Sequence, residues 1–216
     1  MQIAIPLYPE LTSLDAIGPY QVLQHLPGAE IRFCAEQRGT LVDDAGYLRI
    51  DVEHTLDELD TPDVVVVPGG FVTRRLAREG GPLVEWLRAV HPTTTWTTSV
   101  CTGALLLGAA GILDGLTATT HWTAYDELAR YGATPTEQRV VVQGKVITAA
   151  GVSASIDMGL TLAAQLMGPE VAQAIQLGIE YDPQPPFDSG SPSKADPAIR
   201  QGLVDHVARS EAAGLG

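Results

Sequence analysis

Short apolar runs alternate with helical patterns along most of the chain. Uninterrupted apolar runs of this length are typical of strands that are buried on both faces. The clearest examples are residues 2–7 and 64–67, and residues 30–35 and 93–98 are expected to be strands as well. Because helical spacing of apolar residues follows most of these runs, we predict an α/β fold, a mostly parallel sheet with helices on both faces.

Two pairs of short strands are expected to form hairpins. Residues 40–44 and 47–52 flank Gly46, and residues 140–143 and 145–148 flank Gly144. Small residues 149–153 then open a long helix that ends at Gly168-Pro169. A helix with Ser13 as a candidate cap is predicted from the apolar pattern at Tyr20, Val22, Leu23 and Leu26. Other helices are predicted at residues 73–78, 82–90, 123–131, 169–177 and 198–213.

The chain length of 216 residues suits one domain, residues 1–216. At about residues 180–197 the composition becomes rich in proline. Prolines remove backbone donors and restrict their neighbours, so we expect this segment to be an irregular arm. Tyr181 and Phe187 could anchor this arm. It could cover a site, clasp a second subunit, or simply tether the last helix.

The charge balance and the cysteine count limit the classes of function. A formal net charge of −13, from 13 Lys and Arg against 26 Asp and Glu, disfavours nucleic-acid binding. No apolar stretch is long enough to span a membrane, and no Cys/His spacing is typical of a metal site. Two cysteines and a start without a signal-like region make the cytoplasm the expected location.

Cys101 stands where the strand at residues 93–98 passes into a helix. Ser99 and Gly103 flank it at two residues on either side, a spacing typical of a nucleophile elbow. Backbone amides at the helix start would lower the pKa of the thiol, so a reactive thiolate is expected. The alternative is an inert, buried cysteine, which is the expectation for Cys34.

Two other strand ends are expected to meet Cys101. Asp15 lies near a helix start after the first strand, and Gly69-Gly70 follow residues 64–67. The carboxyl could move protons, with the Thr102 hydroxyl orienting it, and the glycine amides could stabilise negative charge. Alternatively, Asp15 complements a helix dipole and the glycines form a plain turn. His121 is expected to be structural, although a role in the site is open.

These residues resemble the DJ-1/PfpI superfamily, which has a flavodoxin-like (class I glutamine amidotransferase-like) fold. Within it, the details are similar to the isonitrile hydratase family. The matching segments are Leu14-Asp15-Ala16-Ile17-Gly18-Pro19, Pro68-Gly69-Gly70, Ser99-Val100-Cys101-Thr102-Gly103, Thr119-Thr120-His121-Trp122, Gly151-Val152-Ser153 and Tyr181-Asp182-Pro183.

The resemblance implies hydration of an isonitrile to an N-substituted formamide. Cys101 would be the nucleophile that forms a thioimidate, Asp15 the general acid and base, and Thr102 its support. The backbone of Gly151 and Val152 would lie close to the cysteine. The resemblance also implies a homodimer with a small-molecule isonitrile as substrate, and no cofactor.

Two alternatives come from the same superfamily. One is a ligand-sensing module related to AraC-like regulators, which would require a helix-turn-helix region beyond the short segment 195–216. The other is a glyoxalase or redox-protective thiol protein, in which Glu would be expected at position 15 and His beside the cysteine. Asp15 and Thr102 argue against this second alternative.

Overall fold

A computed structural model of the protein describes residues 1–212. Within these residues a seven-stranded sheet has the order β10-β11-β7-β6-β1-β2-β5, and all neighbours are parallel except β10 and β11. Two-stranded pairings β3–β4 and β8–β9 lie outside it. The strands are β1 Gln2–Pro6, β2 Glu30–Ala35, β3 Gly39–Val42, β4 Arg49–Val52, β5 His54–Thr55, β6 Val64–Val67, β7 Trp96–Val100, β8 Thr117–Ala118, β9 Thr134–Pro135, β10 Val140–Gln143 and β11 Val146–Ala149.

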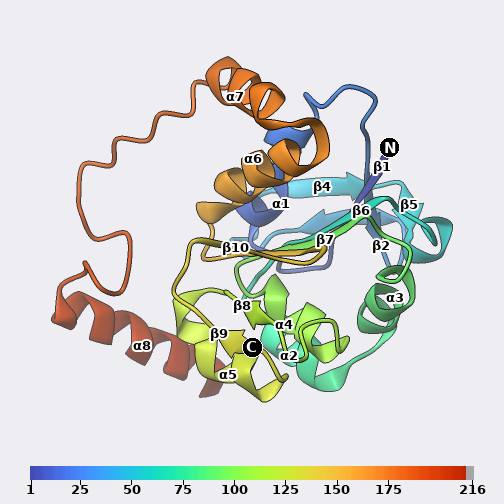
Figure 1. The fold of residues 1–216 in the computed structure, drawn as a ribbon. Coiled ribbons are helices and arrows are strands. Elements are labelled where there is room, and N and C mark those ends of the chain that lie inside the picture. Colours follow the sequence, from blue (N-terminus) through green and yellow to red (C-terminus); the bar gives the residue numbers. More distant parts are fainter. Residues whose placement is uncertain (213–216) are drawn as a thin grey trace.

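Helices cover both faces of the sheet, as predicted. Figure 1 shows α1, α6 and α7 over one face and α2, α3, α4 and α5 over the other. The α-helices are α1 Ser13–Leu23, α2 Thr73–Glu79, α3 Pro82–Val90, α4 Gly103–Ala109, α5 Tyr125–Arg130, α6 Ala154–Met167, α7 Pro169–Gly178 and α8 Pro197–Ala212. Single 3₁₀ turns occupy Leu56–Glu58 and Trp122–Ala124. None of the helices within residues 1–212 is long and apolar enough to cross a membrane.

The central strands confirm the predictions made from unbroken apolar runs. All residues of β6 and the last four of β1 are buried, because helices pack on both faces of these strands. The two predicted hairpins form as β3–β4 and β10–β11. The strand β7 begins later than predicted. Thr93 and Thr94 donate their hydroxyl and amide hydrogens to the end of α3, which leaves β7 to begin at Trp96.

Two helix predictions also need new boundaries. The segment predicted as one helix at 123–131 is a 3₁₀ turn followed by α5, because His121 caps the turn through its ring. The predicted last helix is α8, of which Ala213 lies outside the described residues.

Gly103 fixes the distance between α4 and the sheet. A Cβ at this position would lie 2.5 Å from the carbonyl oxygen of Val67 and 2.6 Å from that of Pro68. Only glycine therefore allows the first turn of α4 to rest on the end of β6. This close approach brings the residues after β6 beside those after β7.

The arm and α8 form the outermost part of the chain. Figure 1 shows the arm running away from α7 and returning to α8, which lies beside α5. No residue of α8 is buried. An ion pair of 3.1 Å between the buried Arg74 of α2 and Glu211 holds the far end of α8 on the body.

Candidate active site

Four neighbouring strands, β11, β7, β6 and β1, run parallel and deliver their carboxyl ends to one edge of the sheet. Cys101 follows β7, Gly69 follows β6, and Val152 follows β11 in sequence. Asp15 lies in the first turn of α1, after β1. The sheet thus brings together the residues that the sequence predicted to meet, at the edge where open α/β sheets hold their ligands.

The backbone of Cys101 is held in a left-handed conformation with φ of 54°. Such a conformation costs a non-glycine residue about 1–3 kcal/mol and persists only where the surroundings enforce it. Here the Cys101 amide donates to the carbonyl oxygens of Ala149 and Ala150, at 3.1 and 3.0 Å, and Thr120 Oγ1 donates to the Cys101 carbonyl at 2.8 Å. These contacts form the sharp turn that the elbow pattern predicted.

Gly69 is the point around which the carboxyl and the thiol gather. A Cβ at Gly69 would lie 2.7 Å from Asp15 Oδ2, 2.7 Å from the Thr102 amide nitrogen and 2.9 Å from Cys101 Cβ. The Gly69 amide donates to Asp15 Oδ2 at 3.0 Å. Glycine is therefore required here because any side chain would separate Asp15 from Cys101.

The glycine pair does not present free amides, contrary to the prediction. The Gly69 amide is used by Asp15, and the Gly70 amide donates to Thr102 Oγ1 at 3.1 Å. Both amides hold side chains of the site in place rather than facing a ligand.

The Thr102 hydroxyl does not make the contact with Asp15 that was expected. Its hydroxyl donates to the Gly70 carbonyl at 2.9 Å and accepts from the Gly70 amide, so it clamps the turn after β6 instead of bonding to Asp15. Its backbone amide has a different role, because it donates toward the Cys101 sulfur and lowers the pKa of the thiol.

The carboxyl of Asp15 is fully buried. Burial raises its pKa from 3.8 to about 7, and the Gly69 amide and the Cys101 thiol offset only part of this rise. The second oxygen, Oδ1, accepts no hydrogen bond of standard geometry from the described residues. Asp15 therefore exchanges a proton near neutral pH and has one oxygen without a fixed donor.

The thiol of Cys101 is protonated at rest, which corrects the expectation of a preformed thiolate. Burial and the charge of Asp15 raise the pKa of Cys101 well above its usual range, and the Thr102 and Val152 amides oppose this only in part. Cys101 is 6% exposed, and two adjacent buried groups cannot both carry a negative charge. The pair therefore holds at most one charge, which rests on Asp15.

His121 and Cys34 have structural surroundings, as predicted. His121 Nδ1 contacts Thr123 Oγ1 at 2.8 Å, and burial together with the charge of Arg74 lowers the pKa of His121 to about 4. Cys34 is buried in β2, and burial raises its pKa to about 12. His121 is thus neutral at neutral pH, and its lowered pKa makes it a weaker base than Asp15.

Tyr8 and Thr120 were not predicted to belong to the site. The Tyr8 hydroxyl donates to the Pro68 carbonyl, and burial, then the charges of Asp15 and Cys101, raise the pKa of the phenol. Tyr8 directly follows the first strand, and its place at the carboxyl edge was the signal that could have revealed it. Thr120 has no such signal, because its hydroxyl bonds to backbone that is distant in sequence.

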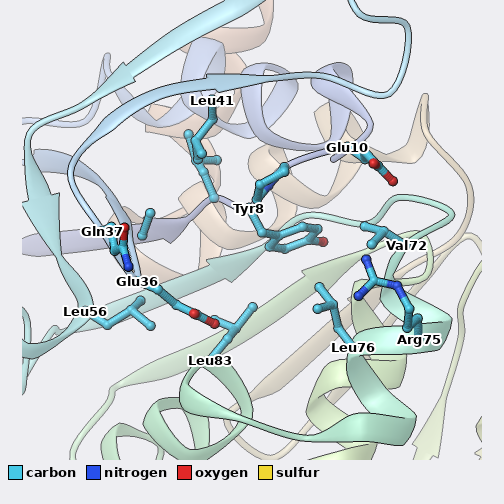
Figure 2. A pocket seen from close by; sticks show the side chains of 13 residues that line it. Tyr8, Glu10, Glu36, Gln37, Leu41, Leu56, Val72, Arg75, Leu76 and Leu83 are labelled. Carbon is cyan, nitrogen blue, oxygen red and sulfur yellow. The ribbon is translucent and has the colours of Figure 1, made fainter.

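Tyr8 also lines a cavity of about 380 Å³. Figure 2 shows the ring between Leu41 and Leu76, with Glu10 and Arg75 near the phenol end. Neither Asp15 nor Cys101 lines this cavity. Among residues 1–212, no group of three or more His, Cys, Asp or Glu side chains is arranged to hold a metal ion.

We predict that Asp15→Asn stabilises the fold more strongly as the pH rises. A carboxyl with a raised pKa in the folded state favours folding below pH 3.8, and this contribution is lost as the pH increases to about 7. Asn has no charge to bury, so the gain over the unmodified protein should grow by on the order of 4 kcal/mol between pH 4 and pH 8.

Urea unfolding of both proteins across this pH range measures the difference. Asp126→Asn, on the exposed side of α5, controls for removing one negative charge from an acidic protein. A gain for Asp15→Asn that does not depend on pH would contradict the raised pKa.

Comparison with known proteins agrees with this fold. Residues 1–165 match the model of the DJ-1/PfpI family. The isonitrile hydratase of Pseudomonas putida is 41% identical over 199 residues, which cover 92% of this chain and 86% of the relative. The crystal structure of a ThiJ/PfpI family protein from Pseudomonas syringae superimposes with a TM-score of 0.92 at 38% identity, over 96% of this chain and 86% of that one.

A more distant relative shares only part of its length with this chain. The HTH-type transcriptional regulator CdhR of Pseudomonas aeruginosa is 34% identical over 127 residues, which are 58% of this chain and 37% of the regulator. The match over residues 1–165, the parallel sheet and the cysteine elbow lead to one conclusion: the chain belongs to the DJ-1/PfpI family.

Proposed function

We propose that the protein is an isonitrile hydratase, which adds water to R–N≡C to give the formamide R–NH–CHO. The observation that carries this proposal is the buried pair of Asp15 and Cys101. The carboxyl titrates near pH 7, and the thiol beside it belongs to a residue with a strained backbone. The similarity to the Pseudomonas putida hydratase supports it over most of the chain. Nucleophilic attack and proton transfer are the two tasks that hydration of an isonitrile requires.

In the first step, Asp15 acts as a base. Its carboxylate takes the proton of the Cys101 thiol as the sulfur bonds to the terminal carbon of the isonitrile. The Thr102 and Val152 amides, which lower the pKa of Cys101, stabilise the charge that develops on sulfur. Asp15 then returns the proton to the same carbon, which gives the thioimidate R–N=CH–S.

In the second step, water adds to the thioimidate carbon. Asp15, again ionised, accepts one proton from the water and delivers it to nitrogen. The hydroxyl proton of the adduct leaves through Asp15 as the carbon–sulfur bond breaks, and it returns to the sulfur. The products are R–NH–CHO and the original thiol. Hydration of the isonitrile transfers protons and adds water without a net oxidation or reduction, so the proposed reaction requires no electron-carrying cofactor.

The proposed working form is a homodimer in the cytoplasm. Exposed apolar side chains at Leu14, Tyr47 and Leu48 support a second copy as the partner. They lie on α1 and on the hairpin turn, and the turn is bonded to the segment before α1 through the Asp44 amide and the Leu11 carbonyl at 3.0 Å. Light scattering should give twice the 22.8 kDa mass of the chain, and a monomer at micromolar concentration would contradict this assembly.

We predict that Cys101→Ala abolishes formamide production from phenyl isonitrile, because it removes the thiol that Asp15 contacts, and the other free cysteine of the described residues lies in β2. In the unmodified protein kcat/KM should rise with pH through a midpoint near 7, as Asp15 becomes the base. Asp15→Asn should lower kcat by at least about a hundredfold and remove this pH dependence. Product formation followed by chromatography measures both effects.

Cys34→Ala is the matched control, since this second cysteine is buried in β2, which β6 and β1 separate from β7 in the sheet. It should retain activity. Absence of turnover in the unmodified protein with both alkyl and aryl isonitriles would overturn the proposed function.

A further inference from the structure

A second hollow, of about 400 Å³, is lined by residues that neighbour the site, although Cys101 and Asp15 themselves do not line it. Leu14, Gly151 and Val152 line its inner end. Leu14 precedes the carboxyl of Asp15, and the Val152 amide donates toward the Cys101 sulfur. A group bonded to that sulfur would therefore have this hollow as neighbouring free space.

The body of the protein supplies one wall of this hollow with ring side chains. His121, Trp122 and Tyr125 line it, and the His121 and Trp122 rings lie 5.8 Å apart between centroids. Glu137 and Arg139 line it too, and Arg139 is paired with Asp157 at 2.7 Å. Gly151 leaves room for this wall, because a Cβ there would lie 2.7 Å from His121 Cδ2. Flat side chains in such an arrangement favour a flat, apolar ligand.

The hydrogen bonds of His121 fix which edge of its ring faces outward. Arg74 donates to Thr123 Oγ1 at 3.1 Å, so the hydroxyl of Thr123 keeps its own hydrogen for His121 Nδ1 at 2.8 Å. The Thr123 amide also donates to Nδ1. Nδ1 is thus the acceptor, and the neutral ring carries its hydrogen on Nε2, the edge next to Gly151.

The proline-rich arm supplies another part of the lining. Gly190, Ser191 and Pro192 line the hollow, although they are distant in sequence from every other residue that lines it. The same residues pack with Ile199 and Leu203 of α8 around the other side of Trp122. Trp122 is therefore the contact that places the arm against the hollow.

We propose that this hollow, which we call the arm pocket, receives the R group of the isonitrile and selects flat, ring-sized groups. This inference rests on the proposed function. Cys101 would bond to the terminal carbon while the ring lies between Trp122 and the arm residues 190–192. The Nε2 hydrogen of His121 would be the donor available to an acceptor atom on the ring. The arm thus determines specificity and does not merely tether α8.

The test compares phenyl isonitrile with methyl isonitrile. Trp122→Ala should lower the ratio of the two kcat/KM values by about tenfold, because the small substrate never contacts the ring wall. Ser191→Trp narrows the pocket from the arm and should reduce turnover of the phenyl substrate while sparing the methyl one. This second variant keeps the test valid if Trp122→Ala releases the arm.

Leu76→Ala is the matched control, since it enlarges the cavity beside Tyr8 that is shown in Figure 2. It should leave the ratio unchanged. The proposal is overturned if Trp122→Ala and Ser191→Trp both leave the ratio unchanged, or if Leu76→Ala is the variant that lowers it.

A binding measurement separates this inference from the proposed function. Calorimetry with the Cys101→Ala protein should show that N-phenylformamide binds and N-methylformamide binds much more weakly, and adding Trp122→Ala should remove the difference. This result would support the arm pocket even if the unmodified protein turned over neither isonitrile. Equal binding of both formamides to Cys101→Ala would overturn it.

Discussion

The buried carboxyl of Asp15 beside the Cys101 thiol is the interaction on which the rest of the site depends. Burial alone would keep both groups protonated, and the proximity of the two groups prevents a double charge. One amide, that of Gly69, is aimed at the carboxyl, and two others, those of Thr102 and Val152, are aimed at the sulfur. The protein thereby keeps a weak acid that can lose its proton near pH 7, and it supports the thiolate only while a reaction forms it. Burying the ionised carboxyl lowers the folding stability of the protein, and the same burial gives Asp15 a pKa at which it can transfer protons near pH 7.

The sheet explains how such a pair can be held so closely. Parallel order in β11, β7, β6 and β1 places four loops at one edge, and small residues let them approach each other. Gly103 allows α4 to rest on the end of β6, and Gly69 leaves space between Asp15 and Cys101. The strained turn at Cys101 is enforced by bonds from β11 and from Thr120. Contacts from distant parts of the chain therefore fix the geometry of a single residue.

Much of this arrangement could be predicted from local patterns. The unbroken valines of β6 identified a buried central strand, and Ser99 and Gly103 around Cys101 identified the elbow. What could not be predicted depends on three-dimensional surroundings. The amides of Gly69 and Gly70 looked free, but Asp15 and Thr102 use them. The helix start after Cys101 suggested a lowered pKa for the thiol, whereas burial and Asp15 raise it. Sequence spacing also gave no indication that residues 190–192 would line a hollow with Val152.

The titration of Asp15 itself tests the central claim most directly. Carbon-13 NMR of protein labelled at the aspartate carboxyl carbons, with the Asp15 signal assigned by its loss in Asp15→Asn, would follow this one group from pH 4 to pH 9. A midpoint near 7 is the predicted result, since burial outweighs the donors around the carboxyl. A midpoint near the usual 3.8 would show that Asp15 is ionised throughout this range, and the account of a carboxyl whose pKa is raised by burial would be wrong.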